Sequence, residues 1–341
     1  MGVFVFLPLV LPLTAWPIAR LAEQRLHPRT ATVLLTGVAG VMALCSTLCL
    51  ALLMVVGTAQ LPGNPLPDGW SDPEVRRSVP RHEIAGKAAI PALFAVVVSC
   101  GRALLRHCRV RRRAHEALSG LPRTGVAVLP DSEPYAYALP GGPRDRIVVS
   151  TGMLACLTSP ERRALFAHER THLSARHHRH LLTVQLAACT NPFLWPLRSA
   201  VTYMVERWAD EQAAEDIGSR KAVARAIGKA ALVSGGASPA TLASLAAPGP
   251  LPRRVAALLG PPPTVHVWPP AFTTVGLALW TATGGATLSA WFSANSAITL
   301  ALLLRAATPL GCRSCSAFLD QIGHLAHLRA RGTEFAAVSR A

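Results

Sequence analysis

Long uncharged apolar runs alternate with basic and polar segments along this chain of 341 residues. Residues 2–19 contain no charged side chain, and residues 31–59 form a second such run. A helix over the second run is long enough to cross the ~30 Å hydrocarbon layer of a membrane at ~1.5 Å per residue. Residues 88–101 form a shorter third run. The pattern predicts three transmembrane helices within residues 1–101.

A fourth apolar run, from residue 255 to residue 304, has no charged residue. It predicts a C-terminal membrane segment at 266–304, consisting of one helix or two. The tail that follows, 305–341, carries Cys312 and Cys315 ahead of two histidines. This order resembles a zinc-ligand spacing, but the histidines are closer together than usual, and an incidental pair or a local disulfide is the favoured alternative.

Positive charge is concentrated beside the apolar runs. The net charge is +16, and six arginines lie between residues 102 and 113, directly after the third run. Basic segments next to membrane helices stay in the cytoplasm, so we expect residues 102–265 to face the cytoplasm of a bacterial-type cell membrane. No nucleic-acid-reading module is recognisable among these arginines, so no direct nucleic-acid partner is expected. The sequence does not indicate an oligomeric state.

Residues 102–265 have the pattern of a folded domain. Three short apolar stretches, at 126–129, 135–139 and 146–150, are typical of strands, and "PGGP" between the last two is typical of a turn. Thr158, followed three residues later by Glu161, indicates the start of a helix. Small apolar residues and leucines recur along that helix.

The helix carries "HERTH", in which His168 and His172 are four residues apart and Glu169 follows the first. Residues i and i+4 share one helix face, so the two imidazoles can bind one metal ion. Glu169 is rotated by about 100° from His168, where its carboxylate can act on a water molecule as a general base. The pattern predicts a catalytic Zn²⁺ site.

A third ligand is expected from another element, and "VERWADEQ" supplies it. Glu206 is the predicted ligand, and Asp210, one turn further, can accept the second N–H of a ligand histidine and fix its tautomer. Both helices must then lie on one side of the membrane. We therefore interpret residues 181–205 as a buried or interfacial helix, a break at two prolines and a second helix, although the run is apolar enough to suggest a crossing.

One simpler interpretation competes with the zinc site. A chain of this composition contains HExxH by chance in roughly one case in 70, so a solvated basic helix is the alternative for the motif itself. The helix-start signals, the preceding strands and the acidic helix that follows argue against that alternative. His177, His178 and His180 are interpreted as surface or interface residues and not as ligands.

The segments "RIVVSTGMLACLTSPERRALFAHERTHLSARHH", "NPFLWPL" and "ERWADEQA" together resemble the membrane zinc peptidases of the BlaR/MecR antirepressor type over about residues 120–220. The resemblance implies an α+β, zincin-like (gluzincin) fold, mainly helical with a small sheet, embedded among transmembrane helices. It implies zinc ligation by His168, His172 and Glu206, with Glu169 as general base. It also implies regulated cleavage of a cytoplasmic protein, typically a transcriptional repressor.

Sensor members of that family carry an external penicillin-binding domain after the last span, whereas this chain has about 37 residues after Leu304 and no S-x-x-K motif there. β-Lactam sensing is therefore not expected. Two other functions stay open. One is a membrane quality-control protease of the HtpX sort, which shares the zinc motif. The other, of a different class, is a non-catalytic membrane signalling scaffold with a relic zinc site.

Overall fold

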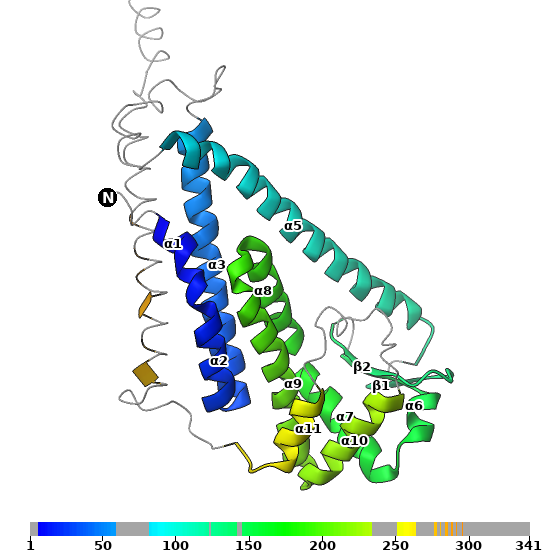
Figure 1. Cartoon of the computed structure of the whole chain (residues 1–341). Coiled ribbons are helices and arrows are strands. Elements are labelled where there is room, and N and C mark those ends of the chain that lie inside the picture. The colour runs from blue at the N-terminus through cyan, green and yellow to red at the C-terminus, as the bar shows by residue number, and fades with distance from the viewer. Residues whose placement is uncertain are drawn as a thin grey trace, which may run out of the picture.

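The computed structural model describes residues 6–58, 82–122, 124–141, 145–233 and 251–263, with single positions between 276 and 295. The fourth predicted membrane segment, at 266–304, lies outside the described residues except for those positions, and so does the tail with Cys312 and Cys315. In the described part, long helices stand side by side and a smaller region of strands and short helices lies at one end of them (Figure 1).

The N-terminal apolar run is helical but divided into three short pieces. These are α1 (Leu7–Val10), the 3-10 helix η2 (Leu11–Thr14) and α2 (Ala15–Arg25). A proline lies in the first turn of each piece, and since proline has no N–H to donate, it interrupts the regular hydrogen-bond ladder. The single continuous helix expected at 2–19 is therefore replaced by a broken one, and its passage through a membrane stays a prediction.

Two described helices are long and apolar enough to cross a membrane, judged by length and composition. They are α3 (Pro28–Thr58) and α5 (His82–Ala117), the counterparts of the second and third predicted spans. The expected boundary between the third span and the cytoplasmic domain, at residue 102, falls inside α5, which continues through the arginine cluster. Arginine is a good helix former, so the charges change the surroundings of the helix without ending it.

The small sheet has three strands: β1 (Val126–Leu129), β2 (Ala136–Leu139) and β3 (Arg146–Ser150). The strand order is β1-β3-β2, with β1 parallel and β2 antiparallel to β3. All three strands occur where the sequence predicted them. The most apolar strand, β3, is central because its side chains are buried on both faces, and β2 is left as an edge strand beside helix α7 (Ser159–Ser174).

The rest of the described domain is helical. Its elements are α6 (Thr151–Cys156), α8 (His177–Thr190), the 3-10 helix η4 (Pro192–Leu194), α9 (Trp195–Ile217), α10 (Arg220–Val233) and α11 (Leu251–Leu259). The structure confirms the predicted helix, proline-bounded break and second helix over residues 181–205. The break turns the chain back, so α8 and α9 form a hairpin that stands beside α3 (Figure 1).

Small side chains hold this hairpin against the N-terminal helices. Alanines of α2 and α3 pack with Leu194, Leu197 and Val201 of the hairpin, and all of them are buried in one cluster. Small residues let helix backbones approach closely. As a result, the C-terminal half of α9 is carried back to α7, and these two helices provide the predicted site residues.

Candidate metal centre

Helix α7, which carries the HExxH side chains, is capped at its N-terminus by side-chain hydrogen bonds. The Thr158 side chain and the Glu161 side chain form a reciprocal capping box, in which Glu161 accepts the Thr158 N–H at 2.8 Å. The two histidines of the motif share one helix face further along, and their Nε2 atoms lie 3.1 Å apart. Two ring nitrogens that face each other at this distance are placed to share one cation.

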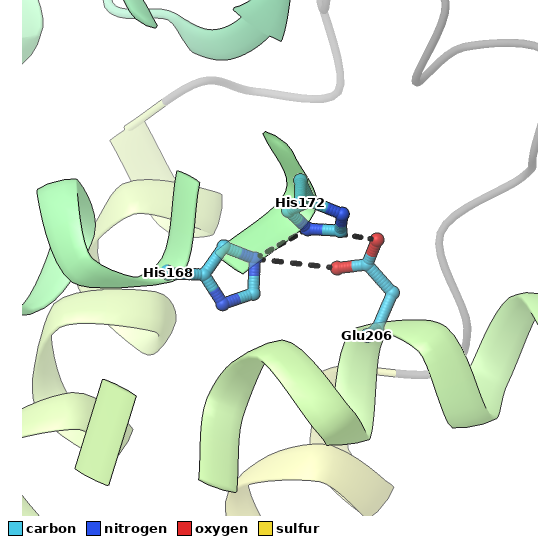
Figure 2. Close-up of side chains that lie close together, drawn as sticks. All are labelled: His168, His172 and Glu206. Carbon is cyan, nitrogen blue, oxygen red and sulfur yellow. Dashed lines mark hydrogen bonds and ion pairs between the residues drawn. The ribbon is translucent and has the colours of Figure 1, made fainter. Parts of the chain in front are cut away.

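Glu206 reaches the same point from α9 (Figure 2). One of its carboxylate oxygens lies 3.6 Å from Nε2 of His168, and the other lies 3.6 Å from Nε2 of His172. The three ligand atoms all lie within 4.8 Å of one another. Atoms bound to one tetrahedral zinc ion at ~2.0–2.2 Å are about 3.3–3.6 Å apart, so the three predicted ligands fit such an ion.

Asp210 lies one turn beyond Glu206 on α9 and is completely buried. Its Oδ1 is 3.0 Å from Nδ1 of His168, on the side of the ring away from the cluster. A carboxylate in this position accepts the Nδ1–H and leaves the Nε2 lone pair for a metal ion. The structure therefore places Asp210 where the sequence led us to expect it.

Glu169 is not one of the three clustered ligands, and its side chain lies next to strand β2 of the sheet. Its carboxylate accepts a hydrogen bond from the backbone of Ala138 on β2. Burial is the largest influence on this side chain and raises its pKa to about 6, although the charge on His168 opposes the shift. A carboxylate with a pKa near neutrality can both take up and release a proton at physiological pH.

Arg254 on α11 belongs to the site but was not predicted from the sequence. It is buried, and its guanidinium contacts Glu206 at 2.9 Å and both oxygens of Asp210 at 2.6 and 2.8 Å. A signal did exist, because Arg254 falls on the apolar face formed by Leu251, Val255 and Leu258. A charge on such a face requires buried carboxylate partners.

His177 was expected to be a surface or interface residue and not a ligand, and a position at the surface is wrong. It is 1% exposed, and its Nδ1 lies 3.0 Å from Nδ1 of His172. On its other side it packs against the Trp208 ring, at 4.7 Å between centroids. The signal that was undervalued is spacing: His177 follows the motif by one turn after a tight left-handed residue at Arg176, which folds α8 back over the motif.

The electrostatics divide the cluster into charged and neutral groups. Burial by itself lowers the pKa of His168. The hydrogen bonds and negative charges of Asp210 and Glu206 outweigh burial, so that the pKa of His168 is raised to about 10. Burial lowers the pKa of His172 to about 4 and that of His177 to about 2. Without a metal ion, His168 is therefore the protonated histidine. It must give up its Nε2 proton when a cation binds.

Comparison with known proteins bears on the segment that holds α7. Residues 102–195 match the sequence model of Peptidase family M48, and residues 269–341 match a family described as bacterial protein of unknown function (DUF899). A curated relative, a protease HtpX homolog of Moorella thermoacetica, is 39% identical over 71 residues, which is 20% of this chain and 23% of the relative. No solved structure matches the chain significantly.

These similarities are local. They span about a quarter of each chain, so they describe a domain and not the whole protein. They do not distinguish the BlaR/MecR type from the HtpX type. With the geometry above, they support a metallopeptidase domain of the M48 kind around the HExxH helix.

Proposed function

We propose that this protein is an integral-membrane zinc metalloendopeptidase that hydrolyses a peptide bond in a cytoplasmic protein. The observation that carries the proposal is the convergence of His168, His172 and Glu206 within 4.8 Å, with Glu169 beside them. Residues from two helices that are distant in sequence supply a three-ligand set, which is typical of catalytic zinc sites.

The side chains divide the proposed reaction among them. When bound to the three ligands, zinc supplies a Lewis acid that polarises a carbonyl oxygen and lowers the pKa of a water molecule. Glu169 takes the proton from the attacking water and gives it to the leaving amine, which balances the hydrolysis. Asp210 and His177 hold the Nδ1 sides of the two ligand imidazoles, so that both Nε2 atoms face the same point.

The substrate backbone would pair with strand β2. This strand is an edge of the sheet, and its Ala138 N–H lies at the Glu169 carboxylate. An extended peptide can add to such an edge through backbone hydrogen bonds. The central strand β3 is excluded as the docking strand because both of its sides are already occupied by strands.

The membrane placement rests on α3 and α5. The C-terminal end of α3 meets the N-terminal end of α5 at Gly57 and Gly86, so the two helices run in opposite directions. The other end of α5, which carries the arginine cluster, lies beside the domain that holds the site (Figure 1). Near the other end of α3, the guanidinium of Arg29 lies 5.6 Å from the centre of the Trp208 ring of α9. Basic residues at that end favour a cytoplasmic location for the site in a bacterial-type cell membrane.

Two biological roles fit this chemistry. The resemblance to BlaR/MecR peptidases favours regulated cleavage of a transcriptional repressor. The similarity to a protease HtpX homolog favours the alternative role of a membrane quality-control protease. The complete ligand set with an adjacent base argues against a non-catalytic scaffold with a relic site.

A comparison of cellular proteomes tests the proposal. Cells with the wild-type protein should contain cleavage fragments that disappear with Glu169→Gln, which keeps the shape of the side chain and removes the base. Glu215→Gln, an exposed change on α9, is the matched control and should preserve the fragments. Fragments of one DNA-binding protein support the regulatory role, and fragments of many membrane proteins support quality control. Unchanged fragments in Glu169→Gln would overturn the proposed mechanism.

A further inference from the structure

The tip of the α8–α9 hairpin exposes large apolar side chains although it is far from the metal centre. Phe193 in η4 is 52% exposed, and Trp195 at the start of α9 is 56% exposed. The N-terminal pieces next to η4 add Val10 and Leu13, both more than half exposed. Single exposed apolar residues are ordinary, but a group of large ones at one end of a hairpin indicates an apolar environment.

The hairpin runs along the two candidate membrane helices. His180, early in α8, lies 3.3 Å from the Thr36 hydroxyl of α3, and Asn191, at the break, donates a hydrogen bond to the Ser46 hydroxyl at 3.2 Å. Ser99 of α5 donates to the backbone of Cys189 at 3.2 Å. The hairpin therefore runs alongside α3. The length of α3 between the contacts at Thr36 and Ser46 is about 15 Å at ~1.5 Å per residue.

Polar groups at the break are satisfied within the protein. The Asn191 side chain accepts the Phe193 N–H at 3.0 Å and donates to Ser46, and Ser46 in turn donates to the Pro8 carbonyl at 2.8 Å. The Leu194 N–H donates to the Asn191 carbonyl at 3.0 Å. A loop in water does not need internal hydrogen bonds of this kind, because water can pair with its polar groups. A helix break inside hydrocarbon is tolerated only where its backbone groups are paired within the protein.

We infer that the α8–α9 hairpin is re-entrant: it enters the bilayer from the cytoplasmic side, and its tip contacts lipid acyl chains. This inference rests on the membrane placement proposed above. Ser46 lies past the middle of the candidate span Pro28–Val55, so the tip penetrates more than half of the hydrocarbon layer and then returns. Arg198 is the single charged residue of the sequence 181–205, and its guanidinium stacks on the Trp195 ring at 4.4 Å, which shields one of its faces.

The base of the hairpin also fixes the position of the metal centre relative to the cytoplasmic end of α3. Trp208, further along α9, packs against His177 on one side, and the guanidinium of Arg29 lies 5.6 Å from the centre of its ring. Arg29 is the second residue of α3. The site is therefore level with the cytoplasmic end of α3, and peptide bonds held close to the inner membrane surface are the ones within its reach.

Tryptophan fluorescence in reconstituted vesicles tests the inference. The full chain is placed in phosphatidylcholine vesicles whose acyl chains carry bromine, which quenches tryptophan on contact, and iodide is used as the quencher in water. Trp195→Phe removes the reporter at the tip, Phe193→Trp adds one there, and Trp208→Phe removes one at the base of the hairpin. Phe94→Trp places a reporter on the exposed side of α5 and tests the membrane placement alone.

We expect the emission removed by Trp195→Phe and the emission gained in Phe193→Trp to be quenched by the brominated lipid and not by iodide. The emission removed by Trp208→Phe should be quenched less by the lipid. Iodide quenching at the tip would place it in water, and protection from both quenchers would place it against protein, so either result overturns the inference. If Phe94→Trp also escapes the brominated lipid, the membrane placement itself fails. The proteome comparison tests the peptidase activity separately.

Discussion

Replacement of Arg254 by methionine should destabilise the metal-free protein strongly, because two buried carboxylates lose their shared cation. Methionine keeps most of the apolar stem and removes the guanidinium. In the wild type that guanidinium lies 2.9 Å from Glu206 and 2.6 and 2.8 Å from the two oxygens of Asp210, whose side chain is completely buried. Breaking a buried ion pair costs about 3–5 kcal/mol.

Arg253→Met is a matched control on the same helix. Arg253 pairs with Glu23 at 2.9 Å, but 48% of its side chain is exposed, so removing it should cost about 0–1 kcal/mol. At ~2–4 °C per kcal/mol for a domain of this size, Arg254→Met should lower the melting temperature by roughly 6–20 °C and Arg253→Met by less than about 4 °C.

Thermal unfolding in detergent, followed by circular dichroism with and without a chelator, measures both variants. Zinc should raise the melting temperature of Arg254→Met more than that of the wild type, because the bound cation replaces the missing positive charge beside Glu206 and Asp210. The reasoning is refuted if Arg254→Met melts like Arg253→Met in the metal-free state. It is also refuted if the deficit is the same with and without zinc.

Three further predictions concern the same centre. His177→Phe should weaken zinc binding by about 10- to 100-fold in a competition with a chelator, because the Nδ1 side of His172 loses its partner; His178→Phe is the control, and equal effects of the two changes would contradict the role of His177. Zinc binding at pH 7 should release close to one proton, measured by calorimetry in buffers of different ionisation enthalpy. The pKa of His168 is raised to about 10, so below that pH a proton competes with zinc for this side chain, and zinc affinity should rise from pH 7 to pH 10. Zinc binding without proton release at pH 7 would disprove this protonation state. Ala138→Pro removes the N–H beside Glu169 and should lower kcat/KM for a peptide substrate with unchanged zinc content, and unimpaired cleavage would argue against β2 as the substrate strand.

Local signals in the sequence predicted the elements that carry the site. Thr158 and Glu161 marked the start of α7, the spacing of His168 and His172 placed both imidazoles on one face, and three apolar stretches indicated the strands. These predictions depend on residues within a few positions of one another, and short-range geometry is the same in every helix or strand.

The features that were missed depend on tertiary contacts. The apolar face of α11 indicates that Arg254 is buried, but Arg254 meets Glu206 only because α11 packs against α9, and the sequence pattern does not show which helix α11 packs against. His177 resembles its neighbours His178 and His180 in sequence, and its spacing from the motif does not by itself show that it is the one buried against Trp208. The full length of α5 was not predicted, because a cluster of charges ends an apolar run, whereas arginine continues a helix as it leaves the membrane.

The central claim is that His168, His172 and Glu206 hold one zinc ion beside a base that is not a ligand. Zinc content per chain, measured by mass spectrometry on purified wild type, His168→Ala, Glu206→Gln and Glu169→Gln, tests it directly. We expect Glu169→Gln to hold as much zinc as the wild type, and His168→Ala and Glu206→Gln to hold one equivalent less. A full zinc content in Glu206→Gln, or a loss of zinc in Glu169→Gln, would contradict the account.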